Sequence, residues 1–283
     1  MKKKIIIVIV LLLIALIAII IPKSTYQKWF GNKGNDENNL TYNLLVYLED
    51  NKNRVVGVSV PVDKIEEDQI RQKWELLTIN SANLPENYKS SLPNDAILES
   101  YELVENELKI YTTEAIKNAN GRKAMESIAW TFIDENIEYV SIYVDEEIID
   151  TFGEYQFKQI NKRNGINLNY ETLYLYESNA TTMIYYEEEM IVPVTYFHLE
   201  EDVCSYIIMK ALEENTDVEN CNYTFEESVL TLDFVDASLL TTNQITTIVE
   251  SVEFNLDVDS LNINNNENIF YQVVFNEIKE DIQ

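Results

Sequence analysis

The sequence predicts an α+β fold made of two tandem copies of one small domain, placed after an N-terminal transmembrane helix. Three observations support this prediction: an apolar run at the start of the chain, strands interrupted by amphipathic helices, and a match between the two halves of the remainder. The chain has 283 residues, which is the length of about two domains.

The apolar run predicts a membrane anchor over residues 1–22. Residues 5–21 read IIIVIVLLLIALIAIII and, as a helix, would span roughly 26 Å, close to the thickness of a bilayer core. Three lysines precede the run, so we expect a cytoplasmic N-terminus and an extracytoplasmic remainder. A cleaved signal peptide is the alternative, but no small-x-small cleavage site follows Pro22. The polar residues 23–40 are expected to form a linker.

The first predicted domain covers residues 41–152. Apolar residues recur at helical spacing in two stretches, 64–79 and 119–135, which are therefore predicted as helices. Alternating apolar runs bounded by polar turns are typical of strands. The predicted strands are 41–49, 54–62, 96–104, 107–112 and 138–144, followed by a short strand to about residue 150.

The second predicted domain covers residues 181–276 and repeats this order of elements. Its predicted helices are 200–214 and 240–254. Residues 153–180 are assigned to an inter-domain connection and residues 277–283 to a tail. The predicted strands are 181–187, 190–197, 222–226, 228–235, 258–263 and 268–275.

A residue-level match indicates that the second domain is a copy of the first. Corresponding apolar residues are separated by 120 to 122 positions in strand, helix and strand. The matched pairs are Leu108 and Leu230, Ile110 and Leu232, Ile128 and Ile248, Val140 and Leu261, and Ile142 and Ile263. We interpret this as a duplicated β-β-α-β-β-α-β unit of about 100 residues, in which helices cover one face of a sheet.

Composition excludes several classes of function. With 49 acids against 21 Lys and Arg, the formal charge is −28, and a surface of that sign repels nucleic-acid phosphates. One His and two Cys are too few for a Cys/His zinc site. We therefore expect no catalytic residue, cofactor or metal, and no enzymatic activity.

A few residues are of the types that form catalytic sites, disulfides or metal sites in other proteins. His198 is expected to be an exposed or edge-strand residue, since no nucleophile motif accompanies it. Cys204 and Cys221 are seventeen positions apart, and both a disulfide and two buried thiols stay open. The run Glu187–Glu189 and the pair Asp257 and Asp259 lack the loop of a calcium site and are expected to be solvated turns.

Aromatic residues are abundant, with three Trp and 18 Tyr. Trp74 and Trp130 lie on predicted helices, where we expect them to pack in the core. Tyrosines suit strands by propensity, and only a cluster of them on one exposed sheet face would favour a binding surface.

The first domain resembles the GerMN domain, a module named after a sporulation and germination protein. The resemblance rests on the opening strand (LLVYLED, 44–50), the turn and strand at 92–98 (LPNDAIL), the strand ELKIY at 107–111, and the closing segments IAWTF (128–132) and VSIYVD (140–145). Asn94-Asp95 and Asp145-Glu146 depart from the family's usual Gly-containing turns. The second domain lacks the Leu-Pro turn, so we regard it as a degenerate copy.

The resemblance implies a function through protein–protein contact. GerMN domains are similar to ring-building modules of the machinery that joins the membranes of a forming spore. The resemblance therefore implies an anchored, extracytoplasmic scaffold of the bacterial envelope, with envelope proteins or further copies of itself as partners. A peptidoglycan-binding module is the alternative expectation, and an envelope hydrolase is a third.

Overall fold

The computed structural model describes residues 42–79, 84–171, 178–187, 190–212 and 221–275. The expected anchor, the linker, the turn at 188–189 and the tail lie outside these residues. Within the described part of the chain, no helix is long and apolar enough to cross a bilayer.

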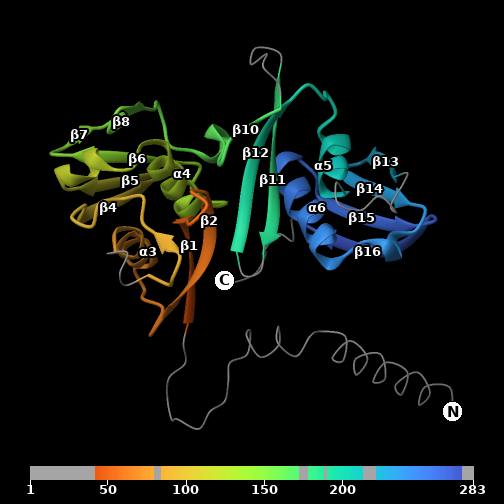
Figure 1. The fold of residues 1–283 in the computed structure, drawn as a ribbon, viewed down its shortest axis with the longest axis horizontal. Helices are drawn as coiled ribbons and strands as arrows, with labels where there is room; N and C mark the ends of the chain where they lie inside the picture. Colours follow the sequence, from red (N-terminus) through yellow and green to blue (C-terminus); the bar gives the residue numbers. More distant parts are fainter. Residues whose placement is uncertain (1–41, 80–83, 172–177, 188–189, 213–220, 276–283) are drawn as a thin grey trace, which may run out of the picture. The chain divides into compact units, whose positions relative to one another are not determined.

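The first repeat follows the predicted order of elements, with one short strand, β3 (Tyr88–Lys89), that was not predicted (Figure 1). Its helices are α3 (Gln69–Thr78) and α4 (Gly121–Phe132), with a short 3-10 helix at Glu114–Asn118. Its strands are β1 (Tyr42–Asp50), β2 (Val55–Val62), β3 (Tyr88–Lys89), β4 (Leu98–Val104), β5 (Glu107–Thr112), β6 (Tyr139–Val144) and β7 (Glu147–Ile148).

The second repeat has the same order, except that β3 has no counterpart among its described residues. Its helices are α5 (Val203–Leu212) and α6 (Thr242–Asn255), with a 3-10 helix at Ala237–Leu239. Its strands are β11 (Asn179–Glu187), β12 (Met190–His198), β13 (Cys221–Glu226), β14 (Val229–Phe234), β15 (Ser260–Asn265) and β16 (Asn268–Val274).

Each repeat contains a four-stranded sheet in which only the central strand pair is parallel. The strand order is β4-β5-β6-β7 in the first repeat and β13-β14-β15-β16 in the second. Ile110 pairs with Ile142 in one sheet, and Leu232 pairs with Ile263 in the other. These are the residues that the sequence match aligned, so the duplication is present in the register of the strands.

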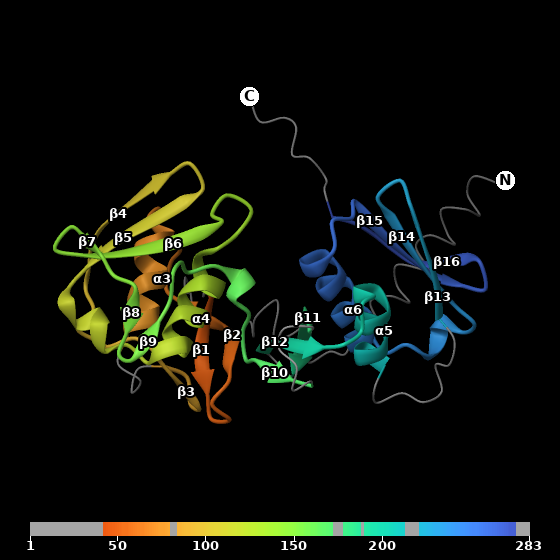
Figure 2. The ribbon, with the colours of Figure 1, turned by 90° about the horizontal axis from the view of Figure 1, so that it is seen from above.

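The sequence predicted two layers in each repeat, a sheet and its helices, but the structure has three. The opening hairpin of each repeat does not join the four-stranded sheet. It lies on the other side of the helices, so that α4 packs against β1 and β6, and α6 packs against β11 (Figure 2). The reason is visible in β2, where the four residues 55–58 are all buried, although a half-solvated strand would expose alternate residues.

The region between the repeats contributes to the first core. It contains β8 (Thr151–Phe152), β9 (Tyr155–Gln156), a 3-10 helix at Lys162–Asn164 and β10 (Asn169–Tyr170). Phe157, Ile160 and Ile166 are buried in the core of the first repeat. The segment predicted as a connection therefore packs as part of a folded unit over much of its length.

Candidate functional site

The two repeats are joined through one continuous sheet. Its order is β10-β12-β2-β1-β3, with β11 on β12, so the hairpin of the first repeat pairs with the hairpin of the second. Among the described residues two pairs make this connection, Val58 with Met190 and Gly57 with Ile191. A Cβ on Gly57 would lie 3.0 Å from Cζ of Tyr47 and 3.1 Å from Cβ of Ile191. Glycine thus permits the close approach of the two hairpins.

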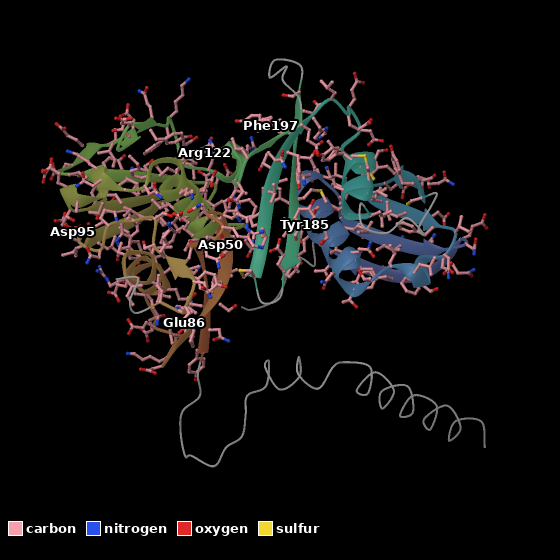
Figure 3. All side chains as sticks on the ribbon, in the orientation of Figure 1. Asp50, Glu86, Asp95, Arg122, Tyr185 and Phe197 are labelled. Carbon is pink, nitrogen blue, oxygen red and sulfur yellow. The ribbon has the colours of Figure 1, made fainter. Side chains whose placement is uncertain are left out.

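An ion pair reinforces this junction at its polar end. Arg54 donates from both terminal nitrogens to the two carboxylate oxygens of Glu187, at 2.8 and 2.9 Å, and from Nε to Asp50 at 2.9 Å. The hydrogen bonds from Arg54 hold the pKa of Glu187 below its usual value. Figure 3 labels Asp50 on the first hairpin and Tyr185 on the second. Glu187 is therefore bound in a bidentate pair between the repeats, whereas the sequence predicted a solvated turn residue.

The side chain of Asn167 continues the junction. It accepts a hydrogen bond from the amide of Val55 at 2.8 Å and donates to the carbonyls of Val55 and Pro193 at 2.7 and 2.8 Å. One amide group thus bridges β2 and β12 where the strands themselves do not pair.

The helices of the two repeats also meet. The ring of Trp130 on α4 stacks on Phe254 on α6, with the centroids 5.1 Å apart. Tyr47 packs against Trp130 from β1 at 5.5 Å. Shared strands, an ion pair and an aromatic contact together connect the two repeats. The aromatic contact also confirms the prediction that Trp130 is a packing residue, and Trp74 is likewise buried.

A cavity of about 630 Å³ lies beside the junction, between the second hairpin and the start of α6. Its cations have acidic partners, since Arg54 binds Glu187 and Lys210 lies 2.5 Å from Glu171. The hydroxyl of Tyr185 donates to that of Tyr196 at 3.3 Å. These groups offer hydrogen bonds to a ligand, but they include no nucleophile paired with a base.

His198 is buried, contrary to the expectation of an exposed or edge-strand residue. It ends β12 where that strand lies between β10 and β11, and its Nε2 is 2.8 Å from Oγ1 of Thr181. Its ring stacks on Tyr206 with centroids 3.5 Å apart. Burial lowers the pKa of His198, which favours the neutral form of the imidazole.

The two cysteines lie on adjacent elements. Cys204 is buried near the start of α5, Cys221 is half-buried at the start of β13, and both are free thiols in this structure. The hydroxyl of Tyr223 donates to Asp202, which ties these two element starts together. The disulfide stays a prediction. No cluster of three or more acids, Cys or His able to hold a metal occurs among the described residues.

The outer face of the β4–β7 sheet carries a feature that sequence reasoning did not locate. Tyr111 on β5 and Tyr143 on β6 pair across the strands, and their rings stack with centroids 5.0 Å apart. A shallow hollow of about 760 Å³ surrounds them. The alternation of the two strands does place both tyrosines away from the core, but the parallel pairing that brings them together is not local.

Comparison with solved structures identifies the arrangement. The chain is similar to the tandem GerMN domains of the sporulation protein GerM from Bacillus subtilis, with a TM-score of 0.68 and 20% identity. The match covers 81% of this chain and 92% of that one. The isolated first GerMN domain of the same protein also matches, with a TM-score of 0.39 and 20% identity over 44% of this chain and 98% of that one.

Sequence comparison adds nothing to this result, since no family model and no curated protein matches the chain. At 20% identity the likeness concerns the fold. The resemblance drawn from strand and turn segments is confirmed at that level: the chain has the tandem GerMN fold.

Proposed function

We propose that this protein is an anchored scaffold of the bacterial envelope that acts by protein–protein contact, in a sporulation-related process. The observation that carries the proposal is the junction of the two repeats. A continuous sheet, the Arg54–Glu187 pair and the Trp130–Phe254 stack fix two copies of one module relative to each other. Such a unit presents surfaces at a set spacing, which is what an assembly component requires.

The fold supports the same proposal. The structure that it resembles over most of both chains belongs to a protein described as a sporulation protein. We carry that role over as part of the proposal, together with the expected anchor at residues 1–22 and an extracytoplasmic position for the two repeats.

Two measurements test the proposal on the full chain in its own cells. Protease added to intact protoplasts should digest the repeats, as expected of an extracytoplasmic position. Covalent cross-linking followed by purification in mild detergent should recover the protein with envelope proteins or with further copies of itself. Protection from the protease, or a chain that purifies alone after cross-linking, would contradict the proposal.

A junction variant makes the second measurement more specific. Gly57→Val should reduce the recovered partners because it disturbs the spacing of the repeats. Ser59→Val, at an exposed position on the same strand, is the matched control and should recover them as the unchanged protein does.

A further inference from the structure

The outer face of the β4–β7 sheet presents a row of residues that crosses all four strands. Ser100 pairs with Tyr111, Tyr111 with Tyr143, and Tyr143 with Ile148. The opposite face carries the fully buried Leu108 and Ile110, which pack toward the helices. The tyrosines therefore point away from the core of their own repeat.

The second repeat shows that the fold does not need this tyrosine pair. Ile110 and Ile142 are paired core residues, and their counterparts Leu232 and Ile263 are paired in the same way. The next residue on each strand differs, because Tyr111 and Tyr143 correspond to Asp233 and Asn264. The core-facing residues are thus apolar in both repeats, whereas the residues on the outer face differ. The stacked tyrosine pair therefore occurs in the first repeat and not at the corresponding positions of the second.

Acidic side chains surround the stacked rings. The Tyr111 hydroxyl lies 3.4 Å from a carboxylate oxygen of Glu102. Lys109 lies on the same face, but its ammonium is 3.8 Å from Glu107. The carboxylates that line the hollow with the two tyrosines belong to Glu99, Glu102, Asp145 and Glu146.

We propose that this surface, formed by the two tyrosines and these four acids and called here the tyrosine face, binds a lysine- or arginine-bearing segment of a partner protein. Aromatic rings attract cations through their negative faces, and the surrounding carboxylates complement the same charge. An acidic glycan or an anionic lipid surface would be repelled by the four acids. The inference rests on the proposed scaffold function and names one of its surfaces.

The test uses the full chain in nonionic detergent and, as probe, a short acetylated peptide that alternates arginine and serine. The same peptide with uncharged citrulline in place of arginine measures the contribution of charge. Affinity is determined by fluorescence anisotropy of the labelled peptides at physiological and at raised salt. We expect the arginine peptide to bind and the citrulline peptide to bind at least tenfold more weakly.

Replacement of the rings separates the tyrosine face from general attraction to an acidic protein. Tyr111→Asn with Tyr143→Asn leaves the net charge unchanged and should weaken binding roughly five- to tenfold. Tyr111→Leu with Tyr143→Leu keeps apolar bulk and should weaken it similarly. If both double variants fold, as shown by circular dichroism, and bind the peptide as the unchanged protein does, the proposal is wrong.

A matched pair of charge variants checks the location. Glu99→Gln with Glu102→Gln should weaken binding more than Glu226→Gln with Glu227→Gln, which changes the charge equally beside the sheet of the second repeat. Equal effects would mean diffuse attraction and would overturn the proposal. Tyrosine-dependent binding to purified peptidoglycan that exceeds binding to the peptide would also overturn it, in favour of a glycan surface.

The experiments distinguish a failure of the tyrosine-face proposal from a failure of the proposed scaffold function. If the asparagine variant retains every cross-linked partner of the unchanged protein and also binds the peptide normally, the scaffold function stands and the tyrosine face is not its surface. If peptide binding depends on the tyrosines but the chain cross-links to nothing in cells, the surface stands and the scaffold function falls.

Discussion

Thr131 and Ser251 occupy the same position in the two repeats and make the same hydrogen bond. The hydroxyl of Thr131 on α4 accepts from the amide of Tyr47 at 2.9 Å. The hydroxyl of Ser251 on α6 accepts from the amide of Ile184, also at 2.9 Å. In both repeats, a hydroxyl on a helix thus accepts a hydrogen bond from a backbone amide of the opening hairpin. Without this hydroxyl the buried amide would lack a partner.

Loss of either hydroxyl should destabilise the protein. Thr131→Val and Ser251→Ala each leave a buried amide without its partner, which costs about 1 to 3 kcal/mol. Denaturant unfolding of the full chain in detergent measures this cost. Thr131→Ser keeps the acceptor and is the control, and an equal loss of stability in that variant would show that the lost hydrogen bond is not responsible.

Gly57→Val should be strongly destabilising. The added side chain would meet Tyr47 and Ile191 at distances below normal carbon contacts, and overpacking of this kind costs typically about 1 to 3 kcal/mol. Thermal unfolding compares it with Ser59→Val, whose side chain is exposed. Equal midpoints for the two variants would mean that the hairpins can separate without cost.

Glu49 should make stability depend on pH in the acid range. Burial by itself would raise its pKa, but hydrogen bonds and charges from Lys123 and Lys89 outweigh burial and hold the pKa below the ordinary value of 4.5. The stability that the carboxylate contributes is therefore fully present above that value and is lost as the pH falls through the lowered pKa. Glu49→Gln should lower stability at neutral pH by about 1 to 2 kcal/mol.

Measuring the free energy of unfolding of the unchanged protein and of Glu49→Gln as a function of pH tests this dependence. The unchanged protein and Glu49→Gln should differ at neutral pH, and the difference should shrink as the pH falls below 4.5 and through the lowered pKa of Glu49. A difference that stays constant over the whole range would show that Glu49 acts by packing rather than by charge.

Cys204 and Cys221 are expected to join under oxidation. The Tyr223–Asp202 hydrogen bond ties together the starts of α5 and β13, where the two thiols lie, and burial raises the pKa of each to about 12. Because such thiols react slowly at neutral pH, the bond should form with oxidised glutathione at alkaline pH. It should add about 3 kcal/mol of stability in the chain-entropy model.

Mass spectrometry of the intact chain provides the measurement. Oxidation should remove the mass of two hydrogens, and Cys221→Ser should abolish the change. Mixed disulfides with glutathione at both thiols, in place of the loss of two hydrogens alone, would contradict an internal bond.

The apolar pattern of the sequence was sufficient to predict most helices and strands, but it did not predict the residues at which they begin and end. The helix predicted from residue 64 begins at Gln69, because the side chain of Asp68 accepts from the amide of Arg71 and caps it. Apolar spacing carries no information on such a cap. His198 was misplaced for a related reason, since its burial depends on β10 and β11, which come from other parts of the chain.

The sequence by itself determined the order of most elements, their duplication and the core-facing side of strands such as β5, β14 and β15, because these depend on apolar periodicity and on the near-constant offset between copies. Only the tertiary structure decided how the copies are connected. The pairing of β2 with β12, the Arg54–Glu187 bridge and the neighbourhood of Tyr111 and Tyr143 join residues distant in the chain. The edge of a strand can pair with many other strands, and tertiary packing selects the one that it pairs with. The local pattern of apolar residues does not contain this information.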